Sequence, residues 1–185
     1  FKLLFDYKLE PEIYSFHLLD EFIRAAEHNG ITNFPIHVKI DTGMHRLGFS
    51  PDDMPELVRR LNRQTAVIPS SVFSHFVGSD SELFDSFSKI QAERFKAAAD
   101  ILQQAFRHNI TRHICNSAGI ERMTDEHFDM VRLGLGLYGI NPVNNKMLEN
   151  VTTLKTTILQ IRSLSKGETV GYSRRGLLER DSRIA

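Results

Sequence analysis

The 185-residue sequence contains no tryptophan, a single cysteine and no apolar run longer than a few residues. One cysteine excludes an intramolecular disulfide framework and suits a reducing compartment, so we expect a cytoplasmic protein. Because no apolar stretch is long enough to span a bilayer, a membrane-spanning protein is excluded as well. Lys and Arg together number 23, as do Asp and Glu, and this balance gives no support for a surface that binds nucleic acid or membrane lipid.

Two classes of catalytic site also lack their sequence signatures. The eight histidines are scattered, without Cys-x-x-Cys or His-Glu-x-x-His spacing, so we predict no metal site. The Gly-x-Ser-x-Gly motif of serine nucleophiles is absent too. What remains is a chain of ordinary globular composition, 41% hydrophobic and 25% charged.

The chain alternates between helical and strand-like segments up to about residue 145. An amphipathic helix is predicted over 14–29, and further helices begin at Ser50 and at a capping box over 79–82. Short apolar runs predict strands, over 36–40, 72–76, 112–115 and 129–132. This alternation indicates parallel β/α units and therefore an α/β domain over residues 1–145.

The pattern changes after about residue 150. Residues 151–164 are rich in Thr, Leu and Ile without a helical period, and a Lys166-Gly167 turn leads into residues 168–172. This pattern predicts a β hairpin, so we expect residues 150–185 to begin a second, all-β domain. Because the chain starts at Phe1 without an initiator methionine and ends with no closing element, we expect an internal piece of a longer protein.

Polar residues follow the first predicted strand. Lys39 lies on the strand face opposite Ile36 and Val38, and a glycine-containing loop with Arg46 comes next. An exposed edge-strand lysine and a surface arginine are the ordinary alternatives. In an enclosed parallel sheet, however, Lys39 needs a partner. Arg46 is suited to bind a carboxylate through two parallel hydrogen bonds.

Three later positions combine a strand end with a polar side chain. His75 ends the second predicted strand, where β/α enzymes keep their chemistry, although a buried structural histidine is the simpler interpretation. Ser117 follows the third strand and is suited either to cap a helix or to hold a phosphate. Arg132 lies in an apolar strand, where it needs a partner, and Gly134 allows the backbone to approach a ligand closely.

Tyr172 follows Gly171 at the end of a predicted strand. Most tyrosines in such places pack the ring and tether the hydroxyl group. As a catalytic base, it needs neighbouring positive charge to lower a pKa that is ordinarily about 10.

Read together, these segments resemble the alanine racemase family. Five motifs occur in the order of that family: Lys-x-Asp-Thr-Gly-Met-x-Arg-Leu-Gly-Phe, Ser-His-Phe, His-x-x-Asn-Ser-Ala, Val-Arg-x-Gly-x-x-Leu-Tyr-Gly and Gly-Glu-x-Val-Gly-Tyr. The similarity runs from about Tyr14 to Gly176. It implies an eight-stranded TIM-like β/α barrel that binds pyridoxal 5'-phosphate (PLP), followed by a β-rich C-terminal domain. This chain would supply the later barrel strands and the start of that second domain.

The resemblance also implies roles for the residues that match the motifs. Lys39 matches a lysine that is carbamylated in many members and then steadies Arg46, which would reach the cofactor's phenolic oxygen and the substrate carboxylate. Ser117, Gly134 and Leu135 match the residues that hold the cofactor phosphate.

The remaining matches concern the cofactor ring and the proton transfer. Arg132 would face the pyridine nitrogen, and His75 would link it to the catalytic tyrosine of the partner subunit. Tyr172 matches that tyrosine, which acts across a homodimer interface. The resemblance therefore implies a two-base racemase for L- and D-alanine that supplies peptidoglycan synthesis.

The sequence departs from the family pattern at several points. The motif with the lysine that anchors PLP as a Schiff base is absent, as is the late Cys-Met-Asp-type motif, so we expect this chain alone to be inactive. His45 and Ser173 replace residues that are often glycine in the family. Alternatives are a broad-specificity or serine racemase, a non-catalytic PLP-binding homeostasis protein, and a fusion to a Mur-type ligase.

Overall fold

The computed structural model describes residues 1–144, 146–149, 151 and 153–185, which form two compact units, Phe1–Val151 and Thr152–Ala185. Among the described residues, no helix is long and apolar enough to cross a membrane. The first unit contains, in chain order, α1 (Lys2–Asp6), β1 (Glu12–Ile13), α2 (Phe16–His28), β2 (Phe34–Lys39), α3 (Met54–Leu61), β3 (Val67–Phe73), α4 (Asp85–Gln104), β4 (Thr111–His113) and α5 (Ser117–Arg122), with 3-10 turns at Pro51–Asp53, Glu82–Phe84, Thr124–Glu126 and Leu135–Tyr138.

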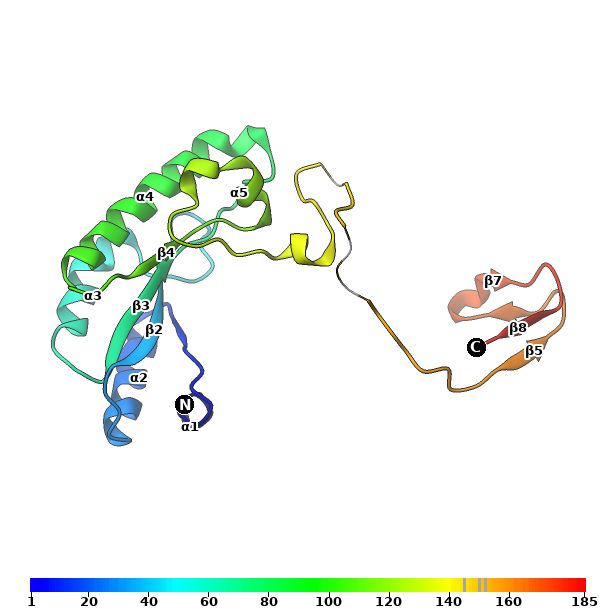
Figure 1. The fold of residues 1–185 in the computed structure, drawn as a ribbon, viewed down its shortest axis with the longest axis horizontal. Coiled ribbons are helices and arrows are strands. Elements are labelled where there is room, and N and C mark those ends of the chain that lie inside the picture. The colour runs from blue at the N-terminus through cyan, green and yellow to red at the C-terminus, as the bar shows by residue number, and fades with distance from the viewer. Residues whose placement is uncertain (145, 150, 152) are drawn as a thin grey trace. The chain divides into compact units, whose positions relative to one another are not determined.

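The sheet of the first unit is parallel, with its strands in the order β1-β2-β3-β4. Figure 1 shows α3 and α4 side by side over one face of this sheet. Alternation along β2 explains the arrangement, because Ile36 and Val38 are fully buried in the hydrophobic core while His37 and Lys39 point to the other face. The parallel pairing confirms the predicted α/β class and leaves one face of the sheet with polar side chains.

Sequence signals set the ends of the helices. Ser15 caps α2, since its hydroxyl accepts a hydrogen bond from the Leu18 N–H at 3.2 Å. The helix therefore begins at Phe16, two residues after its predicted start. Ser50 and Asp53 form a reciprocal capping box before α3, with a proline at the first helical position. The 3-10 turn before α4 is capped by Ser81 and not by Ser79.

Two predicted strands differ from the structure. β3 begins at Val67 and ends at Phe73, so His75 lies two residues beyond the strand and not at its last position. Residues 129–132 form no strand among the described residues, although the Asp129 and Arg132 N–H groups donate to the carbonyl groups of Arg112 and Cys115. These two hydrogen bonds hold the segment beside β4, but they lie too far apart along the chain to form the regular hydrogen-bond pattern of a β-sheet.

The second unit is built from two antiparallel strand pairs. β5 (Arg162–Leu164) pairs with β8 (Ser182–Ile184), and β6 (Thr169–Val170) pairs with β7 (Gly176–Leu177). The predicted hairpin between 151–164 and 168–172 is therefore wrong in its pairing. Gly171, Ser173 and Arg174 have positive φ angles and a 3-10 turn covers Tyr172–Arg174, so the chain after β6 folds back onto itself.

Candidate active site

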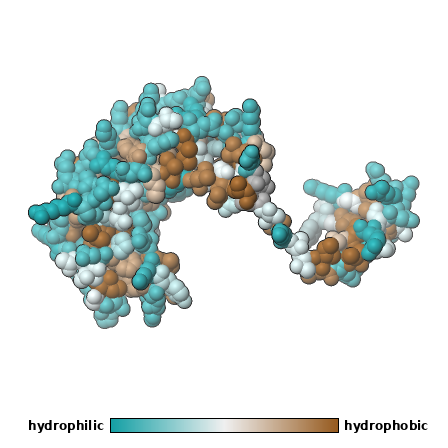
Figure 2. Space-filling view, viewed as in Figure 1, coloured by the Kyte–Doolittle hydropathy of each residue, from teal (hydrophilic) through white to brown (hydrophobic). Residues whose placement is uncertain are grey.

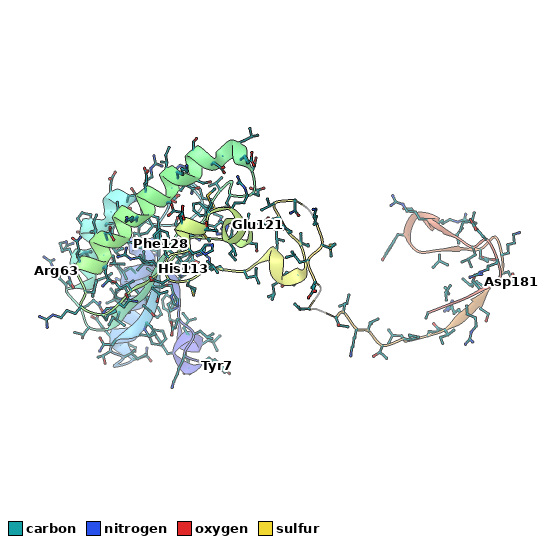
Figure 3. The ribbon with its side chains drawn as sticks, turned by 45° about the horizontal axis from the view of Figure 1, so that its top comes forward. Tyr7, Arg63, His113, Glu121, Phe128 and Asp181 are labelled. Atoms are coloured by element: carbon teal, nitrogen blue, oxygen red, sulfur yellow. The ribbon has the colours of Figure 1, made fainter. Side chains whose placement is uncertain are left out.

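Polar side chains from three strands meet on the face of the sheet that the helices leave uncovered. His37 and Lys39 on β2 are paired in register with Ser71 and Phe73 on β3, and Phe73 is paired with His113 on β4. His113 lies at the end of β4, close to the chain that follows α5 (Figure 3). On the visible face of the first unit, hydrophilic side chains cover the outer surface and hydrophobic ones gather along the hollowed inner side (Figure 2).

Arg132 is the centre of this polar group. One guanidinium nitrogen, Nη2, donates to the carbonyl oxygen of Ser74 at 2.6 Å, to that of Ile114 at 3.3 Å and to Nδ1 of His75 at 3.2 Å. The other, Nη1, donates to Nδ1 and to the carbonyl oxygen of His113. Within the part of the chain that the structure describes, Arg132 forms no salt bridge, so neutral acceptors alone hold this cation.

Burial, together with the positive charge, keeps both neighbouring imidazoles neutral. Burial, followed by the charges of Arg132, Arg46 and Lys39, lowers the pKa of His75 to about 4. Burial and the charge of Arg132 likewise lower the pKa of His113 to about 4, with a smaller contribution from His37. Burial also lowers the pKa of Arg132, but a guanidinium stays protonated at any pH at which proteins are folded. The site at neutral pH is therefore cationic, with two neutral histidines as acceptors.

Lys39 is buried, with 7% of its surface exposed, and its Nζ donates to Oε1 of Glu12 on β1 at 3.0 Å. The Lys39 and Arg132 head groups also lie 5.3 and 5.2 Å from the centre of the Phe73 ring, which is within the range of a cation–π interaction. Lys39 is thus an enclosed ion-pair partner and not an exposed edge-strand residue. The structure places no hydrogen bond between Lys39 and Arg46.

The loop after β2 presents Arg46 as an exposed side chain. Asp41 organises this loop, since its Oδ1 accepts from the N–H groups of Gly43, Met44 and His45 at 2.9, 3.0 and 3.0 Å. Burial alone would raise the pKa of Asp41, but these N–H donors and the His45 side chain outweigh it and lower the pKa. The loop therefore has an anionic centre that fixes its backbone and a cation that projects from it.

A cavity of about 380 Å³ opens beside Arg132. Its polar and backbone lining comes from the ends of β3 and β4 and from the chain after α5, with the residues His75, Asp80, Asn116, Ser117, Arg132, Gly134 and Leu135. Asn116 is the cap of α5, since its side chain accepts from the Gly119 N–H at 2.9 Å. The cap of this helix, one of the two roles expected for Ser117, therefore belongs to Asn116.

The Ser117 hydroxyl contacts the glycine-rich segment on the wall of this cavity. Its oxygen accepts from the Gly134 N–H at 2.9 Å and from the Gly136 N–H at 3.2 Å. Two backbone donors and one hydroxyl therefore converge at one place, which is the donor arrangement that binds an anion. A Cβ added at Gly136 would lie 2.6 Å from Cδ1 of Leu133, the end of an exposed and flexible side chain, and 3.7 Å from the Ser117 hydroxyl oxygen, which is an ordinary contact distance.

Of the residues predicted from the sequence, the structure brings together Lys39, His75 and Arg132 at one end of the sheet, and Ser117, Gly134 and Leu135 beside them. Tyr172 belongs to the second unit, where its side chain is fully exposed. Sequence reasoning missed Glu12, Asp41, Ser71 and His113 as partners within the site. Asp41 and His113 carried a signal, because they belong to the first and third of the five motifs, whereas Glu12 and Ser71 lie outside all five.

The chain matches known proteins along nearly its whole length. The family model described as "Alanine racemase, N-terminal domain" matches residues 1–142. Alanine racemase 1 of Clostridium acetobutylicum is 34% identical over 97% of this chain and 47% of its own length. Alanine racemase of Aeromonas hydrophila is 38% identical over 80% of this chain and 41% of its own length.

Solved structures of alanine racemases also match this chain along nearly its whole length. Alanine racemase of Clostridium difficile 630 superposes with a TM-score of 0.76 at 27% identity, over 97% of this chain and 48% of that protein. The enzyme from Bartonella henselae, solved with covalently bound pyridoxal phosphate, superposes with a TM-score of 0.67 at 24% identity, which shows the shared fold. The chain spans about half the length of the curated relatives that it matches. The predicted fold class, part of a TIM-like barrel, is confirmed, and the chain belongs to the alanine racemase family.

Proposed function

We propose that the intact protein is a PLP-dependent alanine racemase, which interconverts L- and D-alanine in the cytoplasm and supplies D-alanine for peptidoglycan. Membership of the family and the names of its relatives support this proposal. The observation that carries it is Arg132, a guanidinium held by neutral acceptors on the wall of a cavity beside a hydroxyl and two glycine N–H groups.

The residues that line the cavity fit the cofactor. Ser117 and the backbone N–H groups from Gly134 onward form a set of donors that suits a phosphate group, and we assign the phosphate to Ser117, Gly134 and Leu135. Arg132 offers donors and no acceptor, so it suits an unprotonated pyridine nitrogen. PLP, when bound, withdraws electrons from the α-carbon of the amino acid and makes its α-proton acidic.

The chain's own residues would then place and move the proton. Tyr172 acts as the base on one face of the α-carbon, in a homodimer where it reaches the cofactor of the partner subunit. The second base is the cofactor-anchoring lysine, which the resemblance places outside this chain. Inversion requires one base on each face, because the proton must leave from one side and return from the other. His75, held neutral by Arg132, links this arginine to Tyr172 of the partner subunit.

Arg46 binds the substrate carboxylate in this proposal. It is exposed on a loop that Asp41 holds in shape, and its charge is one of those that lower the pKa of His75. A guanidinium can hold a carboxylate with two parallel hydrogen bonds. The residues 153–185 are proposed as the start of the β-rich domain that brings Tyr172 to the site.

The phosphate assignment predicts that Ser117→Ala weakens binding of PLP to the intact protein about tenfold, because one charge-assisted hydrogen bond to the phosphate is lost. Ser88→Ala is the matched control, since the Ser88 hydroxyl is buried and has no hydrogen-bond partner among the residues that the structure describes. Spectrophotometric titration with PLP measures both dissociation constants, and equal affinity for the two variants would contradict the assignment.

The 185-residue chain by itself, supplied with PLP, is expected to give no turnover of alanine.

The ion pair between Lys39 and Glu12 bears on the proposed carbamylation of Lys39. We propose that carbamylation of Lys39 competes with its ion pair to Glu12, because a carbamate would place an anion against the Glu12 carboxylate. Glu12→Gln is expected to raise the carbamate signal several-fold when the intact protein is examined by NMR in carbon-13-labelled bicarbonate. Glu10→Gln is the control, since Glu10 pairs with His37 and not with Lys39. A carbamate signal that is equal in the two variants would contradict the competition.

A further inference from the structure

A row of short polar contacts crosses the sheet behind Arg132, with hydrogen bonds as far as His37 and a contact with a carboxylate beyond it. His113 accepts from Arg132 through Nδ1, and its Nε2 lies 3.2 Å from the hydroxyl oxygen of Ser71. The same hydroxyl lies 2.6 Å from Nδ1 of His37, and Nε2 of His37 lies 2.9 Å from a carboxylate oxygen of Glu10. The row therefore connects a cation in the candidate active site with a carboxylate at the far edge of the sheet.

A β-bulge makes this row possible. Ile36 pairs with Pro69, but the next residue of β2, His37, pairs with Ser71, so β3 carries one extra residue at this point. The extra residue moves Ser71 to the face of the sheet that carries His37 and His113. Without the bulge, Ser70 would be paired with His37 and Ser71 would point to the helices, so the bulge decides which serine joins the two imidazoles.

When His37 carries a single proton, one direction of proton donation satisfies every member of the row. A guanidinium only donates, so Nδ1 of His113 must be the acceptor and the proton of this imidazole must be on Nε2. His113 then donates to Ser71, whose hydroxyl donates to Nδ1 of His37. The proton of His37 in this arrangement is on Nε2, which lies 2.9 Å from the Glu10 carboxylate. A single direction of donation therefore runs from Arg132 through His113 and Ser71 to His37.

We propose that Ser71, His37 and Glu10 are positioning residues, which fix His113 in the one tautomer that can accept from Arg132 and so set the orientation of the guanidinium toward its ligand. This proposal rests on the proposed function for the identity of that ligand, a pyridine nitrogen, but the tautomer itself is a property of the protein without cofactor. If His113 carried its proton on Nδ1, two donors would face each other and Arg132 would turn away.

The surroundings of His113 support a fixed neutral imidazole. Its side chain is buried, with 5% of its surface exposed, and its ring stacks on Phe73 with the ring centres 5.0 Å apart and the planes 6° from parallel. The groups that face it are Arg132, Ser71 and Phe73, with the charge of Lys39 on the far side of that ring. Burial and the charge of Arg132 hold the pKa of His113 at about 4, so the imidazole carries one proton at neutral pH.

The experiment compares Ser71→Ala with Ser88→Ala in the intact protein. Both changes remove one buried hydroxyl, but only that of Ser71 belongs to the row. Nitrogen-15 NMR of the histidines in cofactor-free protein reports the tautomer of His113, and steady-state kinetics reports kcat and KM for alanine. We expect Ser71→Ala to lose the pure Nε2–H signal of His113 and to lower kcat about tenfold with little change in KM.

Conservative variants keep the test decisive. Ser71→Thr retains the hydroxyl group and is expected to restore both the tautomer and kcat. If Ser71→Ala does not fold, the change at the exposed end of the row, Glu10→Gln, is expected to shift the His113 signals in the same direction. An unchanged His113 tautomer in Ser71→Ala, or in Glu10→Gln in that case, would overturn the proposal. Failure of the wild type to bind PLP or to racemise alanine would instead count against the proposed function, because the tautomer is read without cofactor.

Discussion

Arg132→Ala is expected to lower the free energy of unfolding of the intact protein by about 3–5 kcal/mol and to abolish racemisation. The change leaves two carbonyl oxygens, of Ser74 and Ile114, without their donor, together with the Nδ1 atoms of His75 and His113. Each buried acceptor without a partner costs about 1–3 kcal/mol, partly offset where water enters the cavity. The loss of activity follows from the same change, because the cofactor ring loses the donor that we assign to its nitrogen.

Two further variants separate charge from geometry. Arg132→Lys keeps the charge but cannot donate to acceptors on both sides, so we expect an intermediate loss of stability. Arg63→Ala is the control, because Arg63 is an exposed arginine on the outer side of the first unit (Figure 3). Urea unfolding measures all three. A loss for Arg132→Ala that is no larger than for Arg63→Ala would show that Arg132 does not hold the strand ends together.

Gly48→Ala is expected to have the second largest effect, a loss of about 3 kcal/mol or more in the free energy of unfolding together with displacement of Arg46. Gly48 has φ of +135°, a conformation that L side chains rarely adopt, and an added Cβ would lie 2.5 Å from the Asp41 nitrogen and 2.9 Å from the Ile40 carbonyl carbon. These are backbone atoms at the point where Asp41 and Phe49 close the loop with a 2.8 Å hydrogen bond. The clash therefore cannot be relieved by rotating a side chain.

Gly30→Ala isolates the contribution of backbone strain alone. Gly30 also has a positive φ, +66°, but an added Cβ would meet nothing within 4 Å, so we expect a loss of only about 1–2 kcal/mol. Thermal or urea unfolding gives the difference between the two variants, and the KM for alanine reports the position of Arg46. Equal losses for the two glycines would mean that the Asp41–Gly48 loop does not depend on this close approach.

Periodicity and capping signals predicted much of the first unit. The apolar spacing of residues 14–29 predicted α2, and the alternation around Ile36 predicted β2, because these patterns act locally. The α/β class followed from the alternation of such elements. The motifs predicted that Arg132, Ser117 and His75 share one site, and in the structure all three line one cavity.

The remaining features depend on contacts between distant segments. The two-residue strand β1 is too short to have a period, and only its pairing with β2 places Glu12 beside Lys39. The bulge in β3 appears only in the register with β2, and it decides that Ser71 joins the polar face. The Ser117 hydroxyl contacts Gly134 and Gly136, which are 17 and 19 residues later in the chain. No local pattern could reveal these partners.

The proposed function is a two-base alanine racemase in which Tyr172 serves one face of the α-carbon. It can be tested by following exchange of the α-proton and inversion of configuration in deuterated water, with PLP and each enantiomer of alanine, for wild type and for Tyr172→Phe of the intact protein. We expect inversion from both enantiomers in wild type, with Tyr172→Phe impaired far more strongly from one enantiomer than from the other. Absence of exchange from both enantiomers, although PLP is bound, would contradict it.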